Sequence, residues 1–238
     1  MTTTNDQQAQ VTEEGGEAIG VAPPPTAITS PFHRGRPTVV GIPMFIAGSI
    51  ALGLVLVGYI NPVLGAGAAI NLAFGAAALG TLIACIWSIT LGENAVASIY
   101  AVFAGFFTSY LVLELGLLHG WFGFRLGLFA GPLVTSLAIH TEAIFLISWL
   151  AVVGMLILGT LRLPSLVTLL LFLVEVALAL DLTGILRGST TLLMAAGAST
   201  FAFCLIGIPL YLDALNQDLG GRAIPLGRPI ARWFVRSR

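Results

Sequence analysis

The 56 residues from 37 to 92 contain no charged side chain. Because a transmembrane helix needs roughly 20 apolar residues, this run predicts two membrane spans joined by a turn. The rest of the chain agrees, since only 9% of its 238 residues are charged, against roughly 25% in soluble domains. The mean hydropathy is +0.99. The sequence therefore predicts an all-α, polytopic membrane protein and excludes a soluble enzyme.

Apolar runs and turn signals divide the chain into six expected helices. These are residues 38–60, 67–91, 95–118, 142–161, 165–186 and 190–212. Together they form a transmembrane domain over residues 33–215, with an interfacial loop over residues 119–141. Residues 1–32 hold too little apolar surface to fold alone, which predicts a disordered cytoplasmic N-terminal tail. Residues 216–238 are expected to form a basic cytoplasmic C-terminal tail.

The arginines predict the orientation of these helices. The chain has ten arginines and no lysine. With the N-terminus inside, eight arginines fall in cytoplasmic segments and two, Arg125 and Arg187, on the opposite side. Cytoplasmic loops carry the excess of positive charge in membrane proteins. Both termini are therefore expected in the cytoplasm, with the protein in the cell membrane, the inner or plasma membrane of a bacterium.

No enzyme motif, cofactor-binding motif or cluster of metal ligands stands out in the sequence. Cys85 and Cys204 lie within apolar runs, which favours packing roles over a disulfide or a metal site. The net charge of −1 does not indicate nucleic acid as a partner. We therefore expect no catalytic residues, no cofactor and no bound metal, and membrane lipid as the surrounding partner.

Glu175 is the most unusual residue by position, because it lies near the middle of the fifth expected helix. A central acidic residue costs roughly 2.5–3.5 kcal/mol on insertion scales, so such residues usually face the interior of a bundle. Two interpretations stay open: a group that carries a proton or lines a pathway, and a protonated carboxyl hydrogen-bonded inside the bundle. Asp181 and Glu114 lie closer to helix ends, where contact with interfacial water is the simpler explanation.

Several short motifs resemble those of the acetate uptake transporter family of six-helix membrane proteins. Residues 36–42, Arg-Pro-Thr-Val-Val-Gly-Ile, are similar to the family's Asn-Pro-Ala-Pro-Leu-Gly-Leu before the first helix. The first helix closes on Val-Gly-Tyr at 57–59, as in a bacterial relative. Gly-Thr-Leu-Arg at 159–162 resembles the end of the fourth helix. After the last helix, Leu-Asn at 215–216, Gly-Arg at 221–222 and Pro-Leu-Gly at 225–227 also correspond.

The resemblance implies a hexamer in which each protomer conducts small monocarboxylates through a narrow apolar constriction. In the family, a Phe, a Tyr and a Leu build this constriction. The Phe corresponds to Phe45. The Tyr corresponds to Ala104, or to Phe103 if the register shifts by one residue, and the Leu to Val174 or Leu173.

Arg36 stands where the family has Asn. An arginine can bind a carboxylate through two hydrogen bonds at a helix N-terminus, or it can simply set the topology of the first helix. With Asn216 and Arg222 from the C-terminal match, Arg36 is a candidate for the entrance of the solute.

The sequence as a whole favours a channel or transporter for acetate and similar small monocarboxylates, with proton coupling through Glu175 as a hypothesis of its own. Two alternatives remain. One is a channel for another small solute on the same scaffold, such as a neutral amide, ammonia or another organic acid. The other is a membrane scaffold subunit that does not transport and recruits partners through its N-terminal tail.

Overall fold

The computed structural model of the protein describes residues 35–59, 71–121 and 132–231, and every regular element in these ranges is a helix. The expected tail at 1–32 and the end of the C-terminal tail lie outside these residues. The elements are α1 (Thr38–Leu56), the π-helical η2 (Ala73–Ala78), α3 (Leu79–Thr90), α4 (Asn94–Leu118), α5 (Pro132–Thr160), α6 (Ser165–Arg187) and α7 (Thr190–Asp218).

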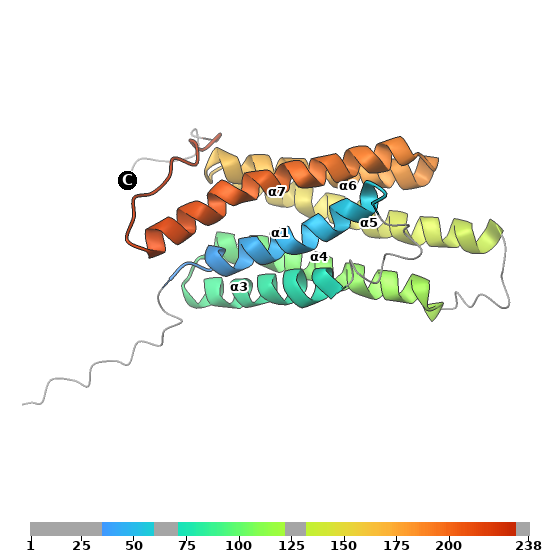
Figure 1. Ribbon diagram of the computed structural model, residues 1–238, viewed down its shortest axis with the longest axis horizontal. Coiled ribbons are helices and arrows are strands. Elements are labelled where there is room, and N and C mark those ends of the chain that lie inside the picture. Colours follow the sequence, from blue (N-terminus) through green and yellow to red (C-terminus); the bar gives the residue numbers. More distant parts are fainter. Residues whose placement is uncertain (1–34, 60–70, 122–131, 232–238) are drawn as a thin grey trace, which may run out of the picture. The chain divides into compact units, whose positions relative to one another are not determined.

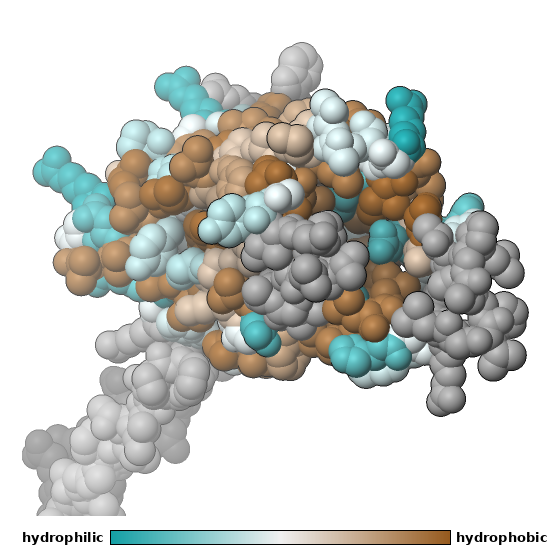
Figure 2. Space-filling view, turned by 45° about the vertical axis from the view of Figure 1, so that its right-hand side comes forward, coloured by the Kyte–Doolittle hydropathy of each residue, from teal (hydrophilic) through white to brown (hydrophobic). Residues whose placement is uncertain are grey.

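Six of the helical segments in these ranges are long and apolar enough to cross a membrane, with η2 and α3 counted as one. This confirms the predicted all-α fold with six such helices. Large apolar side chains also lie on the outside of the bundle, among them Leu158, Leu205 and Ile86, each more than half exposed. Figure 2 shows apolar residues over much of the face that it presents. Such a surface suits contact with lipid rather than water.

The first two spans differ from their expected bounds for local reasons. α1 ends at Leu56 rather than at residue 60, because Gly58 adopts a left-handed conformation with φ of 76°. The Tyr59 N–H then donates to the Leu54 carbonyl at 3.0 Å, a bond that ends many helices. The second span is described from residue 71, and its π-helical turn η2 packs Ala77 against Gly48 of α1.

α5 and α7 are longer than hydropathy predicted. α5 begins at Pro132 rather than at Glu142, with the proline at the N-terminus where its missing N–H costs nothing. Polar side chains in its first turns bond to the helix itself: Thr141 Oγ1 donates to the Leu137 carbonyl at 2.8 Å. α7 continues to Asp218 rather than to residue 212. In both cases the helix continues past the apolar stretch, which marks only the part that crosses the membrane.

Successive spans run in opposite directions and lie side by side (Figure 1). α1 therefore begins at the end of the bundle where α5 ends, α6 begins and α7 ends. Arg36, Arg162 and Arg222 lie there, and we name it the arginine end. The opposite end carries Glu114, Glu142 and Asp181 in its half of the bundle, and we name it the acidic end.

Small residues bring the helices close together along α1. A side chain added at Gly41 would collide with the ring of Tyr100, and one added at Gly197 would collide with Val57. Such positions allow close backbone approach, which lipid does not otherwise drive. This packing places α1 between the η2–α3–α4 group and α7, where its Phe45 side chain reaches the centre of the bundle.

Candidate functional site

A narrow cavity of about 60 Å³ lies at the centre of the bundle. Its walls are almost entirely apolar. They come from α1, α4, α5, α6 and α7: Phe45, Leu52, Leu56, Phe103, Phe106, Phe107, Val153, Val174, Ala177, Leu178 and Phe203, together with the polar residues Ser49, Asp181 and Thr200. A space of this size holds a solute of only a few non-hydrogen atoms.

Four phenylalanine rings that contact one another form part of the wall of this cavity. The ring centroid of Phe45 lies 4.4 Å from that of Phe103, 5.5 Å from that of Phe203 and 6.1 Å from that of Phe107. All four side chains are at most 5% exposed. Tilted and edge-to-face rings at these separations attract one another beyond their shared burial, so the four phenylalanines form a stable aromatic waist.

A second cavity, of about 210 Å³, extends from the waist to the arginine end. It shares Phe45 and Phe103 with the narrow cavity. Arg36, Thr38 and Asp213 are among the polar residues that line it. Hydroxyl and charged groups therefore line this cavity toward the end of the bundle.

The chain that follows α7 folds back over this second cavity. Asp213 holds it: Oδ1 accepts from the Ile224 N–H at 2.6 Å, and Oδ2 accepts from Gln217 Nε2 at 2.8 Å. The Leu166 N–H of α6 donates to the Leu226 carbonyl at 3.2 Å, and Leu226 itself lines the cavity. This returning segment, residues 219–231, therefore forms part of the wall at the arginine end.

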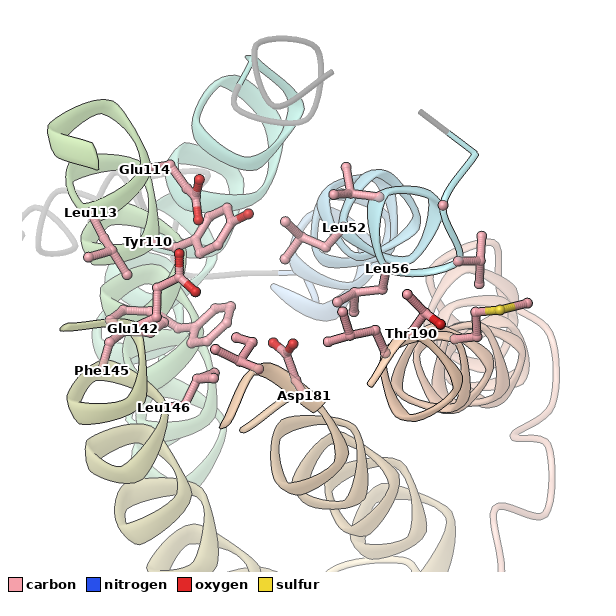
Figure 3. Close-up of a pocket in the computed structure, with 17 residues that line it drawn as sticks. Leu52, Leu56, Tyr110, Leu113, Glu114, Glu142, Phe145, Leu146, Asp181 and Thr190 are labelled. Carbon is pink, nitrogen blue, oxygen red and sulfur yellow. The ribbon is translucent and has the colours of Figure 1, made fainter. Parts of the chain in front are cut away.

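A third and wider cavity, of about 430 Å³, lies on the acidic side of the waist. It shares Leu52, Leu56, Phe106 and Asp181 with the narrow cavity. Figure 3 shows the carboxyl groups of Glu142 and Asp181 and the Tyr110 hydroxyl directed toward its interior, with Glu114 beside Tyr110. α4, α5 and α6 thus each contribute an acidic residue to one cavity, which we name the acidic vestibule.

The structure brings together three of the residues expected at the constriction. Phe45, Phe103 and Val174 all line the narrow cavity. Ala104 and Leu173, the alternatives to Phe103 and Val174, do not line this cavity. Ala104 is buried without lining any of the three cavities, and the half-buried Leu173 uses its carbonyl to accept from Ser199 Oγ at 2.8 Å. Of the two registers considered for the family tyrosine, the structure thus puts Phe103 next to Phe45.

The other expected residues lie apart from the waist. Glu175 does not line any of the three cavities; its carboxyl lies beside Gly154 of α5, and its Oε2 has no hydrogen-bond partner among the described residues. Arg36 lines the cavity at the arginine end and pairs with Asp218 at 3.6 Å. Asn216 Nδ2 donates to the carbonyl of the exposed Arg222 at 2.6 Å, outside that cavity.

Sequence reasoning missed two parts of the site. It explained Glu114 and Asp181 by contact with interfacial water and placed Glu142 at the start of a helix. All three residues line the acidic vestibule. Their signal was present, because charges within or next to apolar runs are rare in this chain. Phe107 and Phe203 of the waist carry no such signal, since one phenylalanine among many in a span does not identify itself. Among the residues that the structure describes, no group of His, Cys, Asp and Glu side chains could hold a metal ion.

Comparison with solved structures relates this fold to a protein of known activity. The chain is similar to a structure described as that of the bacterial acetate channel SatP, with a TM-score of 0.67 and 20% sequence identity. The similarity covers 82% of this chain and 99% of that one. At this identity the match shows a shared fold. A search of curated protein sequences finds no match.

The sequence itself also matches a family. Residues 20–216 match the GPR1/FUN34/yaaH family. This range includes nearly the whole transmembrane region. The match confirms the resemblance to acetate uptake transporters and the expectation of a multi-pass protein of cell membranes. The chain therefore belongs to the GPR1/FUN34/yaaH family, a family of membrane channels and transporters for acetate rather than of enzymes.

Proposed function

We propose that this protein is a channel or transporter for acetate and similar small monocarboxylates, with one pathway in each protomer. One observation carries the proposal: the three cavities follow one another through the bundle and share lining residues where they meet. Phe45 and Phe103 join the narrow cavity to the arginine end, and Asp181 and Phe106 join it to the acidic vestibule.

The chemistry along this series suits a small organic acid. Arg36 offers positive charge at one end, where it raises the local concentration of anions. The aromatic waist then offers an apolar path that a methyl group can enter, while hydrated inorganic ions would lose water there without replacement. Family membership and the fold of the bacterial acetate channel support the same solute class.

A flux assay on purified protein in liposomes tests the proposal. Radiolabelled acetate is expected to enter protein-containing vesicles much faster than empty ones. Phe45→Ala widens the waist, so uptake of propionate and butyrate should rise relative to acetate. Phe172→Ala is the matched control, because Phe172 is more than half exposed and does not line the narrow cavity. Acetate uptake no faster than in empty vesicles would contradict the proposed function.

The acidic vestibule favours a second candidate, a pathway for neutral solutes. Three carboxyl groups line this cavity, and ionised carboxylates repel an anion. A neutral solute, such as an undissociated acid or a small amide, does not meet this repulsion. Competition of unlabelled acetamide, ammonia and propionate against labelled acetate separates the two candidates, because only a solute that uses the pathway slows acetate uptake.

Proton coupling is a further part of the proposal. An ionisable residue within a membrane span is a functional candidate by default. Glu175 is the candidate from the sequence, and Asp181, on the same helix, lines both the narrow cavity and the acidic vestibule. Asp181 shares this vestibule with Glu114 and Glu142, whereas Glu175 lies beside Gly154. The two carboxyls therefore make distinct and separable proposals for the proton carrier.

The orientation and assembly are proposals of the same kind. The bias of arginines favours a cytoplasmic location for the arginine end and for both termini. The resemblance to the acetate uptake transporters favours a hexamer whose protomers each conduct. The orientation is tested by adding single cysteines at either end of the bundle and labelling them from outside intact cells. The assembly is tested by the mass of the protein in nanodiscs.

A further inference from the structure

Ser49 of α1 stands out in the narrow cavity because it is polar and nearly inaccessible, at 2% exposed. It lies one helical turn from Phe45, on the face of α1 that also carries Leu52 and Leu56, since residues three and four apart share a face. All four line the narrow cavity. Its neighbour Gly48 packs against Ala77 of η2, so α1 lies close to the second span at this level.

No hydrogen bond joins the Ser49 hydroxyl to a described residue. Among these residues, Glu175 Oε2 is the one fully enclosed side-chain oxygen or nitrogen without a partner, so the Ser49 oxygen keeps some accessible surface, which faces the cavity. Many hydroxyls elsewhere in the spans donate to a backbone carbonyl. Examples are Thr81 to Ala77, Ser88 to Ala84, Thr108 to Ala104, Ser109 to Gly105, Ser148 to Ile144 and Thr183 to Ala179. Buried polar groups are nearly always paired. An unpaired hydroxyl that faces a cavity therefore indicates a partner that enters the cavity.

The other polar residues of the narrow cavity do not offer the same proton. Thr200 is 4% exposed, and its hydroxyl donates to the Ala196 carbonyl at 3.0 Å. Asp181 carries a carboxyl group rather than a hydroxyl, and it lies where the narrow cavity meets the acidic vestibule. Among the described lining residues, Ser49 thus has the hydroxyl proton that is free for a solute.

The shape of the cavity limits what this proton can meet. About 60 Å³ admits only a small solute, and most of the remaining wall is apolar, with the rings of Phe45, Phe103 and Phe107 among its members. The partner must therefore combine an acceptor oxygen with a short apolar end. A carboxylate with one or two further carbons meets both requirements, and a hydrogen bond to a charged acceptor is stronger than one to a neutral acceptor.

We propose that the Ser49 hydroxyl donates a hydrogen bond to the carboxyl group of a short monocarboxylate while its apolar end packs on the aromatic waist. The proposal rests on the proposed function and names the residue that recognises the solute there. Ser49 is a specificity-determining residue, because the phenylalanines select for size and apolar character while the hydroxyl selects for the carboxyl group.

Kinetics of labelled acetate uptake in proteoliposomes test the role of Ser49. Ser49→Ala removes the donor, and the concentration for half-maximal uptake should rise about tenfold, the range expected for loss of one hydrogen bond to a charged group. Ser49→Thr keeps the hydroxyl and should remain within about twofold of the wild type. Ser109→Ala is the matched control, since Ser109 bonds to its own helix and lines none of the three cavities.

Competition by acetamide separates recognition from a packing effect. Acetamide matches acetate in size but not in charge, so Ser49→Ala should weaken competition by propionate and much less that by acetamide. If Ser49→Ala weakens competition by propionate and by acetamide to the same degree, Ser49 contributes packing alone and the proposal is overturned.

The remaining outcomes also test the role of Ser49. If Ser49→Ala does not assemble, Ser49→Cys fills the same space with a weak donor and should reproduce the rise in half-saturation. Unchanged half-saturation in these variants, with wild-type acetate uptake intact, would overturn the role of Ser49 and leave the proposed function standing. Absence of acetate uptake in the wild type would instead overturn the proposed function.

Discussion

Arg36 Nε lies 3.6 Å from Asp218 Oδ1, and the two side chains join the beginning of α1 to the end of α7. Both are partly exposed, at 46% and 33%, and ion pairs this exposed stabilise proteins little. Their importance therefore lies in charge at the arginine end rather than in stability. Arg36 also lines the cavity there, so its pairing with Asp218 limits how much positive charge the cavity presents.

Changes to either partner should move acetate affinity in opposite directions. Arg36→Ala removes the positive charge, and half-saturation for acetate should rise about two- to threefold at low salt, because attraction of ions is screened as salt rises. Asp218→Asn frees Arg36 and should lower half-saturation. Arg187→Ala, at the acidic end, is the control and should leave the half-saturation for acetate unchanged. If both variants at the arginine end behave as wild type, Arg36 serves topology alone.

Asp213 is expected to hold the returning segment at residues 219–231. Asp213→Ala removes the acceptor of the Ile224 N–H and of Gln217 Nε2. The amides of Ile224 and of Leu166, which donates to Leu226, should then exchange hydrogen faster, as measured by mass spectrometry on protein in nanodiscs. Asp218→Ala is the control, since Asp218 pairs with Arg36 instead. Unchanged exchange at these amides would mean that the segment is held without Asp213.

Close packing between α1 and α4 gives a prediction on stability. Gly41→Ala forces the Tyr100 ring to move, because a side chain there would collide with it, and overpacking of this kind typically costs about 1–3 kcal/mol. Thermal unfolding in detergent should show a lower midpoint. Gly159→Ala is the matched control, since no atom lies within 4 Å of a side chain added there. A Gly41→Ala midpoint equal to that of Gly159→Ala would contradict this account of the packing.

The sequence was sufficient for the membrane fold and for part of the site. A shortage of charge predicted six helices, because the energy of burying charge in lipid is large and local to each span. Phe45, and Phe103 in one of two registers, followed from the resemblance to the family. Their contact across the bundle could not follow from periodicity, since only packing decides which rings meet. Phe107 and Phe203 complete the waist for the same reason.

Helix ends were the least predictable feature, with consequences for the acidic vestibule. Hydropathy placed Glu142 at the start of a helix, whereas α5 begins at Pro132. Glu142 therefore lies well inside α5, and the helix carries it to the cavity that Asp181 and Glu114 also line. Apolar composition reports where lipid begins, whereas the helix itself begins ten residues earlier, at Pro132.

Asp181 and Glu175 make competing predictions for proton coupling. Asp181→Asn and Glu175→Gln each keep the shape of the side chain and remove its titrating proton. If Asp181 carries the proton, Asp181→Asn should abolish the acceleration of acetate uptake by an inward proton gradient, while Glu175→Gln retains it, because only Asp181 lines the path between waist and vestibule. The opposite pattern would assign the proton to Glu175, whose Oε2 has no partner among the described residues. Uptake across a series of pH gradients measures both variants. Gradient-driven acceleration that survives in each single variant and in the double variant would exclude both carboxyls as carriers.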